Sequence, residues 1–109
     1  MRTSEVTVVR VYLTEGEGQL SRLMELLKSK EEVRGVTVFR GIAGFGSSRD
    51  VHTASILDVS LDLPLVLEMF DESGKMQRVM KHLSQIIKPG HMLSWSARTN
   101  IDGSSEKIC

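Results

Sequence analysis

The order of apolar and polar residues along the chain predicts four strands and two helices. The strand segments are rich in β-branched and aliphatic residues, whereas the helix segments repeat apolar residues every three or four positions. The predicted strands are residues 6–13, 33–39, 64–70 and 91–97, with a short extended piece over 54–60, and the predicted helices are residues 19–30 and 72–87. This order is that of the ferredoxin-like βαββαβ sandwich, an α+β fold with two helices on one face of an antiparallel sheet.

Each predicted helix carries one apolar stripe that is expected to cover the sheet. The first stripe consists of Leu20, Leu23, Met24 and Leu27, and the second of Met76, Val79, Met80, Leu83 and Ile87. The sequence KPG at 88–90 is expected to end the second helix, because neither proline nor glycine continues a helix well. Pro64 opens its strand, where a missing N–H does least harm to the sheet.

Both faces of the predicted sheet are apolar. In the first strand Val9 and Val11 alternate with Val8 and Tyr12, whereas an antiparallel sheet with one wet face should alternate apolar with polar residues. Burying an aliphatic side chain contributes roughly 1.5–3 kcal/mol. We therefore infer that a second copy of the chain covers the second face, although strand propensity on an exposed face would give a similar pattern. The residues expected on that face include Arg10, Arg40 and Glu68, and Trp95 is expected to be a core anchor.

Composition limits the classes of function. With 109 residues the chain has room for one domain, expected over residues 1–98 with a flexible tail over 99–109. Its 14 basic and 14 acidic side chains leave no net charge to attract a nucleic acid. No apolar run suits a bilayer span or a secretory signal, and the single Cys109 cannot form an internal disulfide, so we expect a cytoplasmic protein.

The segment RGIAGFGSSRDVHTAS, residues 40–55, is too long for a simple connection between strands. Its glycines permit close backbone approach to a ligand. The segment is not a phosphate-binding P-loop, because Ser47 stands where the lysine of that motif belongs, and its glycine spacing does not match the dinucleotide-binding motif. We expect a site for a phosphate or carboxylate, formed by Gly41, Gly44, Gly46, Ser47, Ser48 and Arg49.

The same segment does not predict an enzyme. Ser48, Asp50 and His52 alternate along one stretch, whereas a catalytic triad places the imidazole between the hydroxyl and the acid. His52, His82 and His91 lack the spacing of a metal site. Two alternatives remain open: a small hydrolase that uses His52 with Ser48, and a metal-binding structural trimer.

Three blocks of the sequence, RGIAGFG, HTASIL and DLPLVLEMFD, resemble the PII-like (GlnB-like) proteins, in a branch that is a domain-of-unknown-function family. The resemblance covers residues 6–98. It implies a ferredoxin-like fold assembled as a homotrimer whose sheets pack inward. It also implies that residues 41–63 form a sensing loop, which contacts a partner and changes shape when a small molecule binds in the cleft between subunits.

The resemblance also implies a non-enzymatic regulatory role with no cofactor. Relatives that bind adenine nucleotides use a glycine-rich turn after the second helix and basic residues near the last strand, which correspond here to Lys88, Gly90 and Arg98. The turn KPGH departs from that pattern because it is very short, so the resemblance does not identify ATP itself as the ligand. In this interpretation Ser47, Ser48 and Arg49 contact the anion and His52 closes the site or reports pH. A membrane transporter such as a fluoride exporter is the partner that the resemblance implies.

Overall fold

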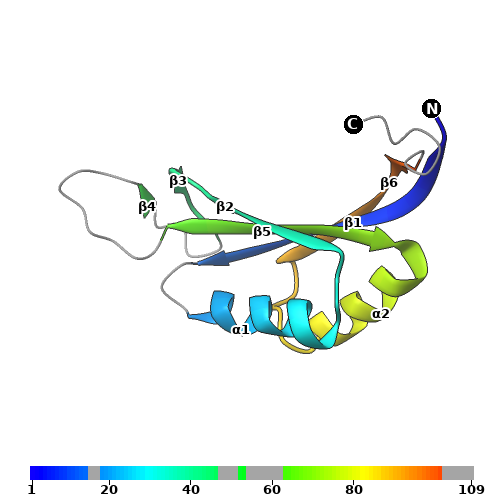
Figure 1. Cartoon of the computed structure of the whole chain (residues 1–109). Coiled ribbons are helices and arrows are strands. Elements are labelled where there is room, and N and C mark those ends of the chain that lie inside the picture. The colour runs from blue at the N-terminus through cyan, green and yellow to red at the C-terminus, as the bar shows by residue number, and fades with distance from the viewer. Residues whose placement is uncertain (15–17, 47–51, 54–62, 102–109) are drawn as a thin grey trace.

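The computed structural model describes residues 1–14, 18–46, 52–53 and 63–101. A four-stranded antiparallel sheet, with strand order β2-β5-β1-β6, carries both helices on one face (Figure 1). The predicted α+β, ferredoxin-like fold is therefore confirmed. The elements are β1 (Thr3–Thr14), α1 (Gln19–Glu25), its π-helical continuation η2 (Leu26–Lys30), β2 (Gly35–Arg40), β3 (Ala43–Gly44), β4 (His52–Thr53), β5 (Pro64–Glu72), α2 (Ser73–Leu83) and β6 (Met92–Asn100).

Several predicted boundaries differ from the structure, among them the ends of α2 and β6. Helix α2 ends at Leu83 rather than at residue 87, because the turns that follow are tighter: the Ile86 N–H donates to the Leu83 carbonyl at 2.9 Å. Strand β6 continues to Asn100, which pairs with Thr3, so the strand takes in two residues that we had expected in the tail. Residues 102–109 and the extended piece expected over 54–60 lie outside the described residues.

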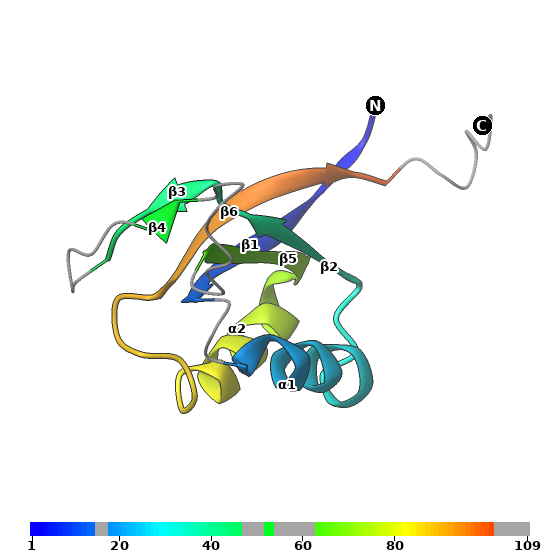
Figure 2. The ribbon, with the colours of Figure 1, turned by 90° about the vertical axis from the view of Figure 1, so that its left-hand side faces the viewer.

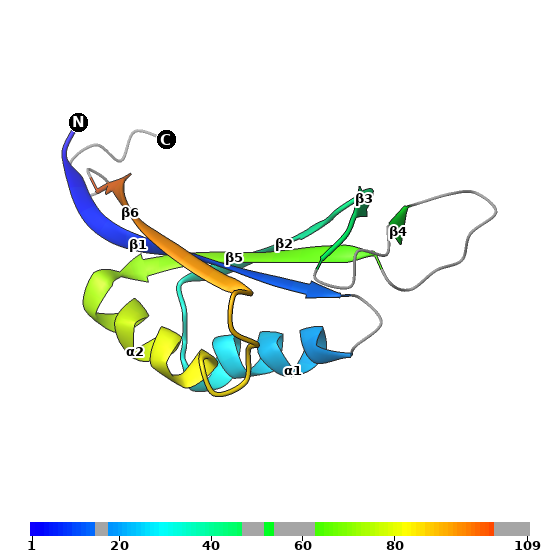
Figure 3. The same ribbon diagram turned by 180° about the vertical axis from the view of Figure 1, so that it is seen from behind.

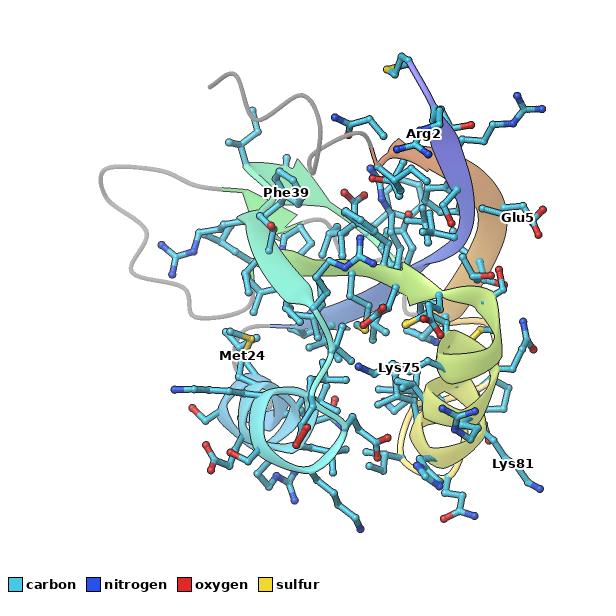
Figure 4. All side chains as sticks on the ribbon, turned by 45° about the vertical axis from the view of Figure 1, so that its right-hand side comes forward. Arg2, Glu5, Met24, Phe39, Lys75 and Lys81 are labelled. Carbon is cyan, nitrogen blue, oxygen red and sulfur yellow. The ribbon has the colours of Figure 1, made fainter. Side chains whose placement is uncertain are left out.

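The core lies between the sheet and the helices (Figure 2). Leu23 and Leu27 from the first helix are buried against Met76, Val79 and Leu83 from the second, as their spacing predicts. The sheet side of the core consists of Val9, Val11, Leu13, Leu65, Leu67 and Met69. Met24 was predicted for the same core but is 37% exposed, because it lies on the flank of α1 toward β2 (Figure 4).

The face of the sheet that points away from the helices, here called the outer face, is also rich in large apolar side chains. Phe39 projects from β2 on this side (Figure 4). The exposed apolar residues on the face are Tyr12, Phe39, Phe70, Leu93 and Trp95, each between 37% and 48% exposed. The prediction of a sheet with two apolar faces is thus confirmed. Within one chain, however, the prediction that Trp95 is a core anchor is wrong.

The strand register also shows that one charged residue lies on a different face of the sheet from the one predicted. Arg10 pairs with Glu68 across β1 and β5, and both lie on the outer face as predicted. Arg40 pairs with Leu65, which is buried against the helices. Because directly opposed residues of an antiparallel pair share a face, Arg40 belongs to the helix side of the sheet and not to the outer face.

Strands β3 and β4 form a short antiparallel ribbon beyond the sheet, in which Ala43 pairs with Thr53 and Gly44 with His52. The ribbon lies at the opposite end of the molecule from the N-terminus and the end of β6 (Figures 1 and 3). No helix in the described part of the chain is long and apolar enough to cross a membrane.

Candidate functional site

An open groove of about 610 Å³ lies at the base of the predicted sensing loop. Its walls come from the end of β1, the start of β5, the glycine-rich segment after β2 and the turn before β6. Four residues predicted for the site line it together: Gly41, Gly44, Gly46 and Gly90. The sequence separates Gly90 from the other three by more than 40 positions, and the antiparallel pairing of the strands brings them to one end of the sheet.

Two of the glycines pack closely against Pro64. The Gly41 N–H donates to the Pro64 carbonyl at 2.7 Å, and a Cβ atom on Gly41 would lie only 2.7 Å from Cγ of that proline. A Cβ atom on Gly44 would lie 3.2 Å from the same Cγ, whereas one on Gly46 would meet open space. Gly41 and Gly44 therefore allow the chain to pack directly on the first residue of β5, which fixes the floor of the groove.

The turn between α2 and β6 forms another wall of the groove. Gly90 has a φ of +84°, a conformation that side chains rarely adopt, so glycine is required at this position. The His91 N–H donates to the Lys88 carbonyl at 3.1 Å, and the Tyr12 N–H donates to the His91 carbonyl at 2.8 Å. These bonds hold the short KPGH turn against the end of β1.

A small polar pocket of about 50 Å³ adjoins the groove. Gln19 and Lys88 line only this pocket, whereas Tyr12, Thr14 and His91 line both cavities. The groove has mostly apolar walls, including Phe45 and Pro64, while the small pocket has a predominantly polar lining. This arrangement suits a ligand with a flat apolar part and a small charged part.

Of the other residues predicted for the site, one lies away from the groove and the rest are not described at the level of their side chains. Arg98 is exposed on β6 and pairs with Glu5, far along the strand from the groove in the same chain. Ser47, Ser48 and Arg49 lie outside the described residues. For His52 the structure describes the backbone pairing with Gly44 but not the side chain.

Sequence reasoning missed several groove residues. Tyr12 and Pro64 were assigned only to strands, and Phe45 was not singled out within its glycine-rich segment. Phe45 is 60% exposed beside three glycines, and an exposed aromatic residue in a loop is a signal that could have been used. Pro64 gave no comparable signal, because a proline at the start of a strand is explained by backbone geometry alone.

A charged pair occupies the outer face, away from the groove. Arg10 Nε lies 2.7 Å from Glu68 Oε1, and the guanidinium carbon lies 5.5 Å from the centroid of the Trp95 ring. The hydrogen bonds that Arg10 donates to Glu68 and to Tyr12 raise the pKa of Arg10 above its ordinary value, while burial acts in the opposite direction. The guanidinium is therefore held as a permanent cation among apolar side chains.

Asp71 connects the loop before β2 to the start of α2. Its carboxylate accepts hydrogen bonds from the Glu72 N–H at 2.8 Å and the Arg34 N–H at 3.0 Å, and Lys75 Nζ lies 3.1 Å away. Burial, the largest single influence, raises the pKa of Asp71, but these hydrogen bonds and the charge of Lys75 together lower the pKa below its ordinary value. Asp71 is thus a structural anion rather than a proton donor.

The groove offers polar groups that can bind a ligand. Within residues 1–14, 18–46, 52–53 and 63–101, no three or more histidine, cysteine or acidic residues gather in a way that could hold a metal ion. The residues that line the groove include the glycine-rich segment, Thr14 and His91. These groups can position a ligand by hydrogen bonds and apolar contact.

The chain is similar to known proteins in sequence and in fold. Residues 6–99 match the family model DUF190, described as "Uncharacterized ACR, COG1993". A UPF0166 protein of Methanocaldococcus jannaschii is 36% identical over 86 residues, which cover 74% of this chain and 78% of that protein.

Among solved structures, CPII, a nitrogen regulatory PII-like protein from Thiomonas intermedia K12 bound to ADP, AMP and bicarbonate, has a TM-score of 0.68 at 11% identity, covering 92% of this chain and all of that one. A Thermus thermophilus protein assigned to PII-like signaling has a TM-score of 0.64 at 18% identity, with 96% and 98% coverage. The predicted resemblance to PII-like proteins is confirmed, and at these identities the structures establish the fold alone.

Proposed function

We propose that this chain, which belongs to the DUF190 family and has a PII-like fold, is a non-enzymatic regulatory protein that binds a small anionic ligand. The ligand is an adenine nucleotide, bound in the groove at the base of the 41–63 loop. The observation that carries the proposal is the convergence of Gly41, Gly44, Gly46 and Gly90 on one groove of about 610 Å³. Ligand sites in proteins commonly have volumes of about 300–1,000 Å³.

In this proposal each of the two cavities binds a different part of the ligand. The apolar walls at Phe45 and Pro64 suit a purine ring, and Lys88 in the adjoining polar pocket suits a phosphate. CPII, which has the same fold, was solved with ADP, AMP and bicarbonate, and this supports a nucleotide rather than another anion as the first ligand to test. Ser47, Ser48 and Arg49 extend the proposed anion site from the loop, with His52 at its closing end.

The outer face supports assembly as a homotrimer. Its exposed aromatic and aliphatic side chains form an apolar surface of the kind that proteins cover with another chain. In such an assembly the grooves lie at the clefts between subunits, where Arg98 from a neighbouring copy completes the basic residues of the site. The loop that carries the β3–β4 ribbon then contacts the partner, for which a membrane transporter such as a fluoride exporter is the class proposed; the ribbon itself lies at one end of the molecule (Figure 1).

The proposal is tested by thermal denaturation with AMP, ADP, ATP, bicarbonate and divalent metal ions. Adenine nucleotides are expected to raise the melting temperature with concentration, since a ligand that binds the folded state stabilises it by RT ln(1 + [L]/Kd). The nucleotide should be recovered unchanged after incubation. Conversion of the nucleotide would favour the small hydrolase, and stabilisation by metal ions alone would favour the metal-binding structural trimer.

Arg49→Ala tests the loop part of the proposed site. The substitution is expected to weaken AMP binding about tenfold, the effect of losing one charge-assisted hydrogen bond, while leaving the melting temperature of the free protein unchanged. Isothermal titration with AMP measures the affinity, and Arg22→Ala on the exposed side of α1 is the control. An unchanged affinity for Arg49→Ala would remove this residue from the site.

A further inference from the structure

A second open groove, of about 640 Å³, lies between the first helix and β2 and is here called the edge groove. One wall is a stripe of α1 and η2 in which Leu20, Met24 and Lys28 follow one another at intervals of four, and the other wall is residues 33–36. The lining is more apolar than polar, and it shares no residue with the groove proposed for the nucleotide. Met24, 37% exposed, lies on the flank of the helix toward β2 (Figure 4).

The main chain of β2 has an unpaired edge beside this groove. Among the described strands only β5 pairs with β2. The Gly41 N–H bonds to the Pro64 carbonyl in the same register, and bonded and non-bonded pairs alternate along an antiparallel ladder. The main-chain groups of Val36 and Val38 therefore point to the free edge of the sheet. Such a row of donors and acceptors is a template for another strand.

One end of the edge groove is positively charged. Lys28 and Arg34 lie there, where residues 31–34 connect the helix to β2, and Glu25 lies one turn further along the helix. Arg34 Nη2 is 3.7 Å from Asp71 Oδ1, so part of its charge is already paired. Lys28 forms no ion pair with a described residue, so it is the cation left for a ligand. This end favours a carboxylate over an ammonium group.

We propose that the edge groove binds the carboxy-terminal segment of another protein as an added strand, antiparallel to β2. The added strand bonds to the main chain of Val36 and Val38 and places every second side chain, an aliphatic one, against Met24. Because it runs opposite to β2, its last residue lies near Gly35, and its terminal carboxylate meets Lys28. In this mode of recognition the main-chain bonds give affinity and the alternate side chains give specificity. The inference is independent of the nucleotide proposal.

The strand that a second copy of this chain would offer fits the edge groove poorly. The other edge strand is β6, in which Ser94 pairs with Val9 on the buried helix side of the sheet. Directly opposed residues share a face, so Ser96 and Arg98 lie on this side too. Adding β6 to β2 would bring serines to an apolar wall and a second cation toward Lys28. The occupant therefore has a different chemistry, aliphatic along its length and anionic at its end.

A library of random seven-residue peptides, displayed with free carboxyl ends, provides the probe. Selection on the full chain is expected to enrich peptides with aliphatic residues at every second position. Met24→Glu, which replaces an exposed apolar wall with a charge, should retain none of them while keeping the wild-type melting temperature. Absence of any peptide enriched on the wild type over Met24→Glu would overturn the proposal.

The position of the carboxylate is tested by titrating the most enriched peptide in its acid and amide forms. The amide should bind about tenfold more weakly, the effect of losing one charge-assisted contact. Lys28→Glu should weaken the acid form at least as much and remove most of the difference between the two forms. Lys30→Glu, the same charge change at a position that does not line the groove, should keep both affinities within about twofold of wild type. Equal binding of acid and amide would contradict the proposed direction of the strand.

Methylation of single main-chain nitrogens in the same peptide tests the pairing with β2. In an added strand only every second N–H faces its neighbour, so binding should be lost at alternate positions and kept at those between them. Loss at every position, or at none, would contradict strand addition. If no peptide is enriched and Met24→Glu instead lowers the number of chains seen by native mass spectrometry, the edge groove is filled by a second copy and the proposal is wrong.

Discussion

At the scale of single residues, Pro64 explains why glycines recur at the base of the loop. Gly41 and Gly44 both pack against its ring, and the Gly41 N–H donates to its carbonyl at 2.7 Å. The glycines could be predicted from the sequence as positions of close approach, but the object that they approach could not. We had expected a ligand there, and within the chain two of the three glycines meet a proline instead.

A series of glycine-to-alanine substitutions tests this packing. Gly41→Ala should destabilise the fold by about 1–3 kcal/mol, because the new methyl group overlaps the Pro64 ring. Gly44→Ala should cost less, because its Cβ would lie 3.2 Å from the ring, and Gly46→Ala, which meets open space, is the control. Urea denaturation measures the order, and equal stabilities for the three variants would contradict the packing of this segment on β5.

Asp71 gives a prediction that depends on pH. Its pKa in the folded protein lies below the ordinary value, so its contribution to stability is full above about pH 4 and is lost as pH falls through the folded-state pKa. Asp71→Asn should therefore lower the free energy of unfolding at neutral pH by about 2 kcal/mol. The difference from wild type should shrink below about pH 4. Denaturation at pH 7, 4 and 3 measures it, with Glu5→Gln on β1 as the control, and a difference that stays constant with pH would contradict the account.

Exposure of individual residues was the least predictable property at this scale. Trp95 and Met24 are apolar residues at positions that suit a core, yet they are 41% and 37% exposed. Spacing along a strand or helix assigns a residue to a face, but it does not say what covers that face. His91 was likewise recognised only as the start of a strand, because its place between two cavities depends on contacts with β1 and α1.

At the scale of elements, the sheet combines a conventional inner face with an apolar outer face that contains a charged pair. Arg10 and Glu68 lie directly opposite each other on the two central strands, β1 and β5. A bonded pair of opposite charges can be covered by an apolar surface at a lower cost than either charge alone. In the proposed assembly the pair therefore lies within the subunit interface.

A charge exchange tests the position of this pair. Arg10→Glu should weaken assembly strongly, because two adjacent carboxylates would then lie on the surface to be covered. The double variant Arg10→Glu with Glu68→Arg should recover much of the assembly by restoring an opposite-charge pair in the same register. Sedimentation velocity measures the assembly, and Arg22→Glu on α1 is the control. Unchanged sedimentation of the single variant would place the pair outside any interface.

The order and type of the main elements could be predicted from periodicity, because each long strand and helix repeats its pattern several times. The shorter features could not. Strands β3 and β4 have two residues each, too few to form a pattern, and they exist through pairing across the loop. The early end of α2 also had no signal in the apolar stripe, since Ile87 remains buried although it lies beyond the helix.

At the scale of the whole molecule, the proposed assembly would account for two features of the single chain. The outer face leaves Phe39, Leu93 and Trp95 exposed, and Arg98, which we propose as a site residue, lies far along β6 from the groove of its own chain. A second and a third copy would cover the outer face of each chain and supply Arg98 to its groove. The apolar outer face could be predicted from strand alternation, whereas the number of copies could not, because alternation contains no information about symmetry.

Native mass spectrometry of the full chain with AMP at micromolar concentration tests the central claim most directly, because it reports the number of subunits and the bound mass in one spectrum. The account predicts three chains with up to three AMP molecules, one for each groove. A single chain without AMP would contradict both the covered outer face and the nucleotide site.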